Sequence, residues 1–170
     1  QVITRDRGMV WEASTKIKGL PVRGFDSFVD GTGMMRWKIL GIIPVIKASG
    51  RDIDRSAAGR TAAEHVWLPS AMLDAGGSFS SIDRRRFGVS ITTGGHESPL
   101  VVEASDGGGL VSVGLRRWGD PGGSGFEYHD FGGYADSEAT FGGYPIPTRL
   151  RIGWHFGGPR FEGEGEFFRV

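Results

Sequence analysis

Apolar and polar side chains alternate along most of this chain, which is the pattern of strands with one buried and one solvent-facing side. From Met9 to Ile17, the odd positions include Trp11, whereas Glu12 and Lys16 occupy even positions. The same period of two recurs at 35–39, 87–92, 100–104, 111–116, 148–156 and 161–169. The pattern predicts about nine or ten strands at the spacing typical of consecutive antiparallel hairpins.

Turn and breaker residues add detail to the predicted sheet. The sequence Asp30-Gly31-Thr32-Gly33 is typical of a tight hairpin turn. Pro44 interrupts the apolar run at 42–48, and a proline cannot donate a ladder hydrogen bond, so this segment favours an edge strand or a bulge. The glycine-rich segment 119–125 predicts a loop.

One segment departs from the alternation and predicts a helix. Residues 52–73 are rich in Ala, Arg and Glu, and Asp52 or Asp54 is placed to cap the start. Pro69 is expected to end the main helix near Trp67, with a further turn after it. Helical spacing puts five side chains on one face: Ile53, Ala57, Arg60, Thr61 and Glu64.

These elements together predict a fold class. A meander of this many strands twists and curls. The expected fold is mainly β, of the α+β class: a curled antiparallel meander sheet or half-barrel of about nine or ten strands around one amphipathic helix. The length of 170 residues fits one domain, residues 1–170. Because the chain starts at Gln1, we expect a chain trimmed at its N-terminus.

Composition narrows the classes of partner. Lys plus Arg and Asp plus Glu each number 20, and this balance argues against a nucleic-acid partner. The absence of cysteine excludes disulfides and thiol catalysis. The apolar run at 39–46 is far shorter than the roughly 20 residues that a membrane-spanning helix needs.

Two motifs resemble those of an uncharacterised bacterial family of unknown function. In that family a Glu-x-x-Trp-x-Pro motif precedes a meander that carries Gly-x-x-Ile-Pro, and the likeness covers most of this chain. The residues on these motifs are Glu64, Trp67 and Pro69 in the first and Gly143, Ile146 and Pro147 in the second.

The resemblance implies a location and a ligand. Family members usually carry more chain before the equivalent of Met9, often with a membrane-spanning or export segment. The resemblance therefore implies a bacterial protein that is exported or membrane-associated and lies close to a membrane. The anchor is expected to be absent from this chain. The expected layout is also similar to LolA-type lipoprotein carriers, half-barrels that hold acyl chains, although fold alone does not determine function.

Glu64 is the charged residue that most needs an explanation, because its carboxylate shares the covered helix face. Arg60 lies four residues before it, so a structural Glu64–Arg60 pair is expected. The alternative is a hydrolase or isomerase acting on an apolar substrate. In that case Glu64 acts as acid or base, with Arg60 or His65 as its partner.

The preferred hypothesis is binding of an apolar small molecule or lipid in the concave face of the sheet. A third interpretation is a protein-interaction module that uses an open sheet edge near Pro44. We expect no metal or cofactor, because the four histidines lack helical zinc spacing. The expected ligand-binding residues are Met35, Trp37, Trp67, Tyr144 and Trp154.

Two charged clusters have simpler interpretations. Arg84-Arg85-Arg86 is expected to be a solvated hairpin, with an anion or lipid-headgroup contact as the alternative. The acidic residues of the predicted last strand are expected to pair across strands with Arg149 and Arg151. These acidic residues are Glu162, Glu164 and Glu166.

Overall fold

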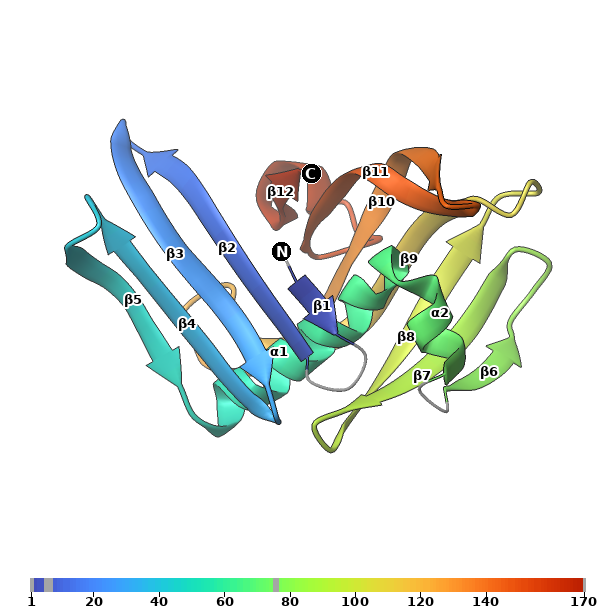
Figure 1. Ribbon diagram of the computed structural model, residues 1–170, viewed down its shortest axis with the longest axis horizontal. Coiled ribbons are helices and arrows are strands. Elements are labelled where there is room, and N and C mark those ends of the chain that lie inside the picture. Colours follow the sequence, from blue (N-terminus) through green and yellow to red (C-terminus); the bar gives the residue numbers. More distant parts are fainter. Residues whose placement is uncertain (1, 5–7, 75–76, 170) are drawn as a thin grey trace.

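The computed structural model describes residues 2–4, 8–74 and 77–169, and it consists mostly of strands in two antiparallel sheets. Figure 1 shows the two sheets on either side of helix α1 (Arg51–Glu64). Neighbouring strands in each sheet are consecutive in sequence, so both sheets are meanders. The predicted class, a curled antiparallel β meander with one main helix, is confirmed.

The first sheet, sheet A, has five strands. It comprises β1 (Val2–Thr4), β2 (Gly8–Ile17), β3 (Leu20–Val29), β4 (Thr32–Ile39) and β5 (Ile43–Ser49). The hairpin expected at Asp30–Gly33 joins β3 to β4. Pro44 lies on β5, at the sheet edge, and the ladder shifts register between Trp37 and Lys38 on the neighbouring strand. The edge and the bulge predicted from Pro44 are both present.

The second sheet, sheet B, has seven strands, ordered from β12 to β6. Its members are β6 (Ser78–Ser81), β7 (Arg86–Thr93), β8 (His96–Ala104), β9 (Leu110–Gly119), β10 (Glu127–Phe141), β11 (Tyr144–Trp154) and β12 (Glu166–Arg169). The described residues thus form twelve strands rather than about nine or ten, because β1 and β6 are too short to produce a clear alternation.

The helical segment between the sheets follows the predicted outline. After α1 the chain makes a 3₁₀ turn, His65–Trp67, and a short helix α2, Pro69–Asp74. The predicted cap is wrong: the residue before α1 is Gly50, and no side chain caps the helix. Both aspartates already lie in the first turn, where they favour the helix dipole. Within the described residues, no helix is both long and apolar enough to cross a membrane.

Small residues let α1 approach both sheets. An amphipathic helix, as predicted, would keep one face exposed to solvent. Ala58, Gly59 and Ala62 are nevertheless buried, because α1 lies between the two sheets (Figure 1). A Cβ atom at Gly33 would lie 2.6 Å from the carbonyl oxygen of Ile53, so only glycine lets β4 come this close to the helix. The Gly33 amide donates to Asp54 Oδ1 at 2.7 Å, which fixes this contact.

The main hydrophobic core lies between α1 and sheet B. Its buried members are Ala62, Val66, Met72, Val89, Ile91, Leu100, Val102, Val113, Leu115 and Phe131. These strand residues sit at alternate positions of β7 to β10, as the period of two requires. Trp67 and Trp154 pack against this core while remaining half-buried.

The C-terminal segment differs from the predicted strand at 161–169. Residues Phe161–Gly165 form a single wide helical turn, and only Glu166–Arg169 pair as β12. The Gly165 amide donates to the Arg160 carbonyl at 3.0 Å, which closes the turn. Arg151 is within 3.5 Å of both Glu162 and Glu166, as expected, but Glu164 pairs with Arg160 instead. The expected pairing of Arg149 is not seen among the described residues.

Candidate functional site

A charged cluster ties α1 to sheet A. Arg60 Nη1 on the helix donates to Asp26 Oδ2 on β3 at 2.6 Å, and Arg60 Nε donates to Glu64 Oε1 at 3.2 Å. Trp37 Nε1 on β4 donates to the other Asp26 oxygen at 2.8 Å. The expected Arg60–Glu64 pair is therefore present, and it extends to a buried carboxylate that the sequence analysis did not single out.

Aromatic rings enclose this cluster. The Arg60 guanidinium lies over Trp11, 4.6 Å from the ring centroid, and Trp11 contacts Trp37 with centroids 5.8 Å apart. Phe168 on β12 meets Trp11 edge-on at 5.3 Å, so the last strand of sheet B touches sheet A here. Met35 is opposite Asp26 in the β3–β4 ladder and is half-buried.

His65 is separate from this charged cluster. Its ring is 3% exposed, and its Nδ1 lies 2.8 Å from the Thr61 carbonyl oxygen. Nδ1 acts as the donor in this bond, because a carbonyl oxygen can only accept. The bond anchors His65 to the preceding helix, α1. The candidates predicted from the sequence, Arg60, Glu64 and His65, line neither of the two cavities described below.

Arg117 on β9 is a second half-buried cation. Its guanidinium lies 4.5 Å from the ring centroid of Phe131 and 5.0 Å from that of Trp154. Nε donates to the carbonyl oxygen of Ser56 at 3.1 Å, and Nη2 lies 3.3 Å from the Ser56 hydroxyl. Among the residues that the structure describes, no carboxylate forms an ion pair with Arg117.

The pKa of Arg117 reflects this setting. Burial, together with the nearby cation Arg60, lowers the pKa to about 9, although the carboxylates of Asp26 and Glu64 partly oppose the effect. The group remains charged at neutral pH, and its charge is incompletely compensated. A positive charge therefore lies against one side of the Trp154 indole.

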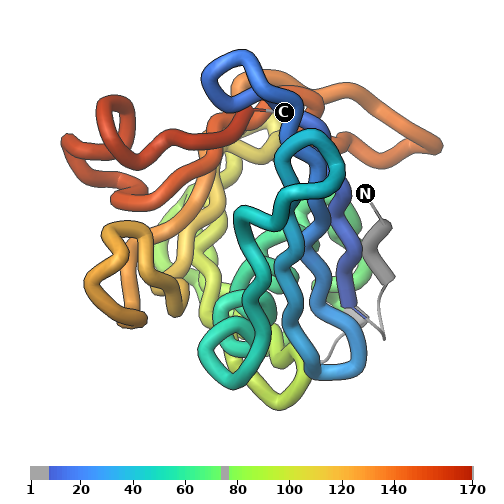
Figure 2. Tube along the Cα trace, turned by 90° about the vertical axis from the view of Figure 1, so that its left-hand side faces the viewer, coloured from blue at the N-terminus to red at the C-terminus, as the bar shows by residue number. Residues whose placement is uncertain are grey.

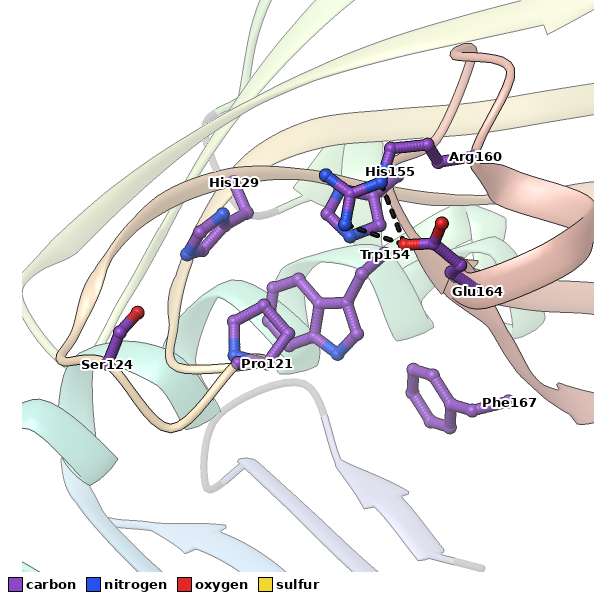
Figure 3. Close-up of a pocket in the computed structure, with 10 residues that line it drawn as sticks. Pro121, Ser124, His129, Trp154, His155, Arg160, Glu164 and Phe167 are labelled. Carbon is purple, nitrogen blue, oxygen red and sulfur yellow. Dashed lines mark hydrogen bonds and ion pairs between the residues drawn. The ribbon is translucent and has the colours of Figure 1, made fainter.

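A cavity of about 510 Å³ opens beside Trp154, at the β10–β11 side of sheet B. Figure 3 shows the indole between His129 and Phe167, with Arg160 and Glu164 above it. Trp154 is paired with Phe131, so it lies on the helix-facing side of the sheet. The lining residues are Pro121, Gly122, Ser124, His129, Trp154, His155, Arg160, Glu164, Gly165 and Phe167.

The cavity wall combines aromatic surface with basic groups. Phe167 is 61% exposed, and the rings of His129 and Trp154 meet edge-on at 6.0 Å. Arg160 pairs with Glu164 at 2.7 Å, and this bond holds the pKa of the Glu164 carboxyl below its usual range. His129 and His155 line the same space, and His129 Nε2 also lies 3.6 Å from a carboxylate oxygen of Glu127.

A second cavity, of about 260 Å³, lies between the start of α1 and strands β8 to β10. Arg55, Arg116 and Arg117 line it, but the first two are already engaged. Arg55 lies between the rings of Trp118 and Tyr128, and its Nη2 donates to the Tyr128 hydroxyl at 2.6 Å. Arg116 pairs with Asp130 at 3.3 Å. This cavity resembles a structural junction more than an open binding site.

The structure brings together only part of the predicted ligand-binding set. Trp154 lines the larger cavity, Trp37 and Met35 lie on the inner side of sheet A, and Trp67 packs on the core. Tyr144 is 59% exposed at the β10–β11 hairpin. Across residues 2–4, 8–74 and 77–169, no group of three or more His, Asp or Glu could hold a metal ion.

Sequence reasoning missed His129, Arg160 and Phe167 as one site, because loops and a helical turn bring them together and leave no fixed spacing. It also missed Asp26 and Arg117, for which a signal exists. Both occupy positions of their strands that alternation assigns to the buried face, beside Phe28 and Leu115. A charged residue at such a position must be paired or functional.

Comparison with known proteins gives a family and nothing finer. No curated protein and no solved structure matches this chain. The model of a family of unknown function, DUF6544, matches residues 1–163, which is nearly the whole sequence. The resemblance to an uncharacterised family is therefore confirmed, and the chain belongs to DUF6544.

Proposed function

We propose that this domain binds an amphiphilic small molecule, with an apolar body and an anionic group, in the cavity beside Trp154. The observation that carries the proposal is a cavity of about 510 Å³ whose wall includes a large exposed aromatic side chain, Phe167. Cavities of roughly 300–1,000 Å³ with apolar walls and a few polar groups are typical small-molecule sites. The proposal refines the expectation of an apolar, lipid-like ligand.

The aromatic part of the wall is held in place before any ligand arrives. Trp154 packs against both Arg117 and Phe131, with its ring 4.9 Å from that of Phe131. A fixed indole loses little freedom on binding, so its contact with an apolar ligand is preserved in the net affinity. Phe167 and Pro121 extend this surface along the cavity.

The polar part of the wall favours a negative group. His129, His155 and Arg160 line the cavity with a single carboxylate, Glu164. A carboxylate or phosphate on the ligand could share the Arg160 donors with Glu164. An enzymatic function with Glu64 as acid or base has less support, because Glu64 lines neither cavity and bonds to Arg60.

Titration with 11-(dansylamino)undecanoic acid, followed by energy transfer from tryptophan, tests the proposal. We expect saturable binding, and we expect Phe167→Ser to weaken it about five- to tenfold, because the apolar contact of one aromatic ring is lost. The matched control is Phe141→Ser at the β10–β11 hairpin, where the side chain is 58% exposed but lines neither cavity. Equal effects of the two substitutions, or no saturable binding, would overturn the proposal.

The anionic group is tested separately with the methyl ester of the same probe. Arg160→Gln is expected to weaken binding of the acid and leave the ester unchanged, whereas Glu164→Gln is expected to strengthen binding of the acid. Both side chains are exposed on the same turn, so neither change should disturb the core. If the two substitutions changed binding of the acid and of the ester equally, the site would recognise only the apolar body of the probe.

A further inference from the structure

The end of sheet A farthest from α1 forms a distinct surface. We call it the sheet-A tip: residues 16–23 of the β2–β3 hairpin and residues 36–47 of the β4–β5 hairpin. The Leu40 amide donates to the Pro21 carbonyl oxygen at 2.9 Å, which joins the two hairpins. Figure 1 shows both turns at the same end of the sheet, and Figure 2 shows them from the side.

The sheet-A tip exposes aliphatic side chains. Ile42, at the apex of the β4–β5 turn, is 75% exposed. The other exposed aliphatic residues of the tip are Ile17, Leu20, Leu40, Ile43, Val45 and Ile46. Scattered apolar residues on a surface are ordinary, but seven gathered at one end of a sheet are typical of an interaction site.

Every charged residue of the sheet-A tip is basic, in a protein whose Lys plus Arg and Asp plus Glu each number 20. All four lysines of the chain are here, and all six basic side chains are exposed. They are Lys16, Lys18, Arg23, Arg36, Lys38 and Lys47. Within the described part of the chain, none of the six forms an ion pair, whereas arginines elsewhere commonly do.

The strand register places like charges opposite each other. Arg23 pairs with Lys38 across β3 and β4, and Arg36 pairs with Lys47 across β4 and β5. Like charges directly opposite on one face destabilise a sheet. This repulsion is relieved when an anionic surface supplies the missing counter-charge.

Leu40 adds independent support. Its φ of 55° lies in the left-handed region, where a bulky side chain is strained and Asn or Gly would be favoured. The turn nevertheless presents a leucine that is 52% exposed. A strained backbone that displays an aliphatic side chain to solvent points to a role for that side chain in contact with a partner.

We propose that the sheet-A tip docks on the surface of an anionic phospholipid bilayer. The aliphatic side chains of the two turns enter the interfacial region, while the lysines, with their long aliphatic stems, reach the phosphate groups. Polybasic segments bind anionic lipid surfaces through the same electrostatic attraction. The surface lies on different strands from the cavity beside Trp154, so the proposal stands without the proposed ligand.

The Arg84–Arg86 hairpin shows what a basic cluster without this role looks like. Arg85 pairs with Asp106 and Arg86 pairs with Asp83, each at 2.7 Å. Hydrogen bonds from the backbone amides of Arg85 and Arg86 and from the Arg86 side chain lower the pKa of Asp83 to about 2. The counter-charges are built into this hairpin, so it serves as a natural control for the sheet-A tip.

Co-sedimentation with vesicles tests the proposal. With vesicles of phosphatidylcholine and phosphatidylglycerol at 3:1 we expect binding that weakens with added salt, and little binding to pure phosphatidylcholine. Ile42→Ser is expected to reduce the partition coefficient about tenfold, and Lys38→Gln about fivefold. The matched controls, Phe141→Ser and Arg84→Gln, should leave partitioning unchanged.

Leu40→Asn separates docking from folding. Asparagine tolerates the left-handed conformation better, so the variant should have an equal or higher Tm and yet bind the anionic vesicles several-fold more weakly. A fall in vesicle binding with an unchanged Tm supports the proposal. Undiminished binding by this variant and by Ile42→Ser would overturn it.

The absence of cysteine allows a direct test of insertion. An environment-sensitive NBD label on Ile42→Cys should brighten several-fold with the anionic vesicles, while the same label on Phe141→Cys should not change. Equal responses at both positions contradict the proposal. The proposal is also contradicted if the protein does not bind vesicles and light scattering shows a dimer that Ile42→Ser dissociates.

Discussion

The two sheets meet the same helix by different chemistry. Sheet B packs aliphatic side chains against α1, and strand residues such as Leu100 and Ile91 are each 1% exposed. Sheet A contributes few large buried side chains, chiefly Met9, Val22 and Phe28. Its polar links to the helix are the Gly33–Asp54 hydrogen bond and Asp26, which accepts hydrogen bonds from Trp37 and Arg60.

This difference explains how the protein combines a stable body with an available surface. Sheet B and the helix bury enough apolar area to hold the fold. Sheet A is fastened at its helix-proximal end, and its other end extends beyond the helix with exposed aliphatic residues (Figure 1). Exposed apolar surface of this kind does not support folding, so it is free to contact a partner.

The largest expected effect compares one aliphatic residue from each sheet. Leu100→Ala in sheet B should lower the free energy of unfolding by about 3 kcal/mol, because it leaves a cavity in the core. Ile46→Ala in sheet A, where the side chain is 43% exposed, should cost less than about 1 kcal/mol. Urea unfolding measures both. Similar costs would mean that sheet A shares the core.

Sequence alternation predicts which residues of the strands face inward, but not that the strands form two separate sheets. The period of two correctly identified the inward residues of the long strands, and Pro44 correctly placed an edge and a bulge on β5. Alternation says which side chains share a face but not which strands pair. The division into two sheets therefore could not be predicted, because it depends on α1 separating β5 from β6.

The site was predicted less well than the fold, for a physical reason. Trp154 was expected to contact a ligand because it is an aromatic residue at an inward position, and it does line the larger cavity. The positions of Arg160 and Phe167 depend on the helical turn Phe161–Gly165, which contains glycines. The alternation that begins at Phe161 and Glu162 predicted a strand there instead. The Arg60–Glu64 pair was found because helical spacing alone fixes it, whereas its extension to Asp26 needs tertiary contact.

An intermediate effect is expected where charge joins sheet A to α1. Asp26→Ala leaves Arg60 with one partner fewer and Trp37 Nε1 without its acceptor, and it should cost about 2–3 kcal/mol of unfolding free energy. The control is Asp130→Ala, which breaks the exposed pair with Arg116 and should cost about 0.5 kcal/mol or less. Equal losses would show that the buried cluster contributes no more than a surface ion pair.

The smallest expected effect concerns the pH dependence contributed by Arg117. Its pKa in the folded protein is about 9, well below the pKa of a guanidinium in an unfolded chain. Between these values the unfolded state binds more protons, so the contribution of Arg117 to stability rises with pH. The cost of burying its charge is fully present below pH 9 and is relieved above it.

The difference in unfolding free energy between wild type and Arg117→Gln isolates this contribution from other groups that titrate at high pH. From pH 8 to pH 10 the difference should move in favour of the wild type by about 1 kcal/mol. Arg116→Gln, on the same strand but with an exposed side chain, should give a difference that is flat with pH. A flat difference for Arg117→Gln as well would mean that its guanidinium keeps its proton through stronger compensation from Asp26 and Glu64. Asp26 of sheet A would then stabilise the charge of Arg117 on sheet B, in addition to its contacts with Trp37 and Arg60.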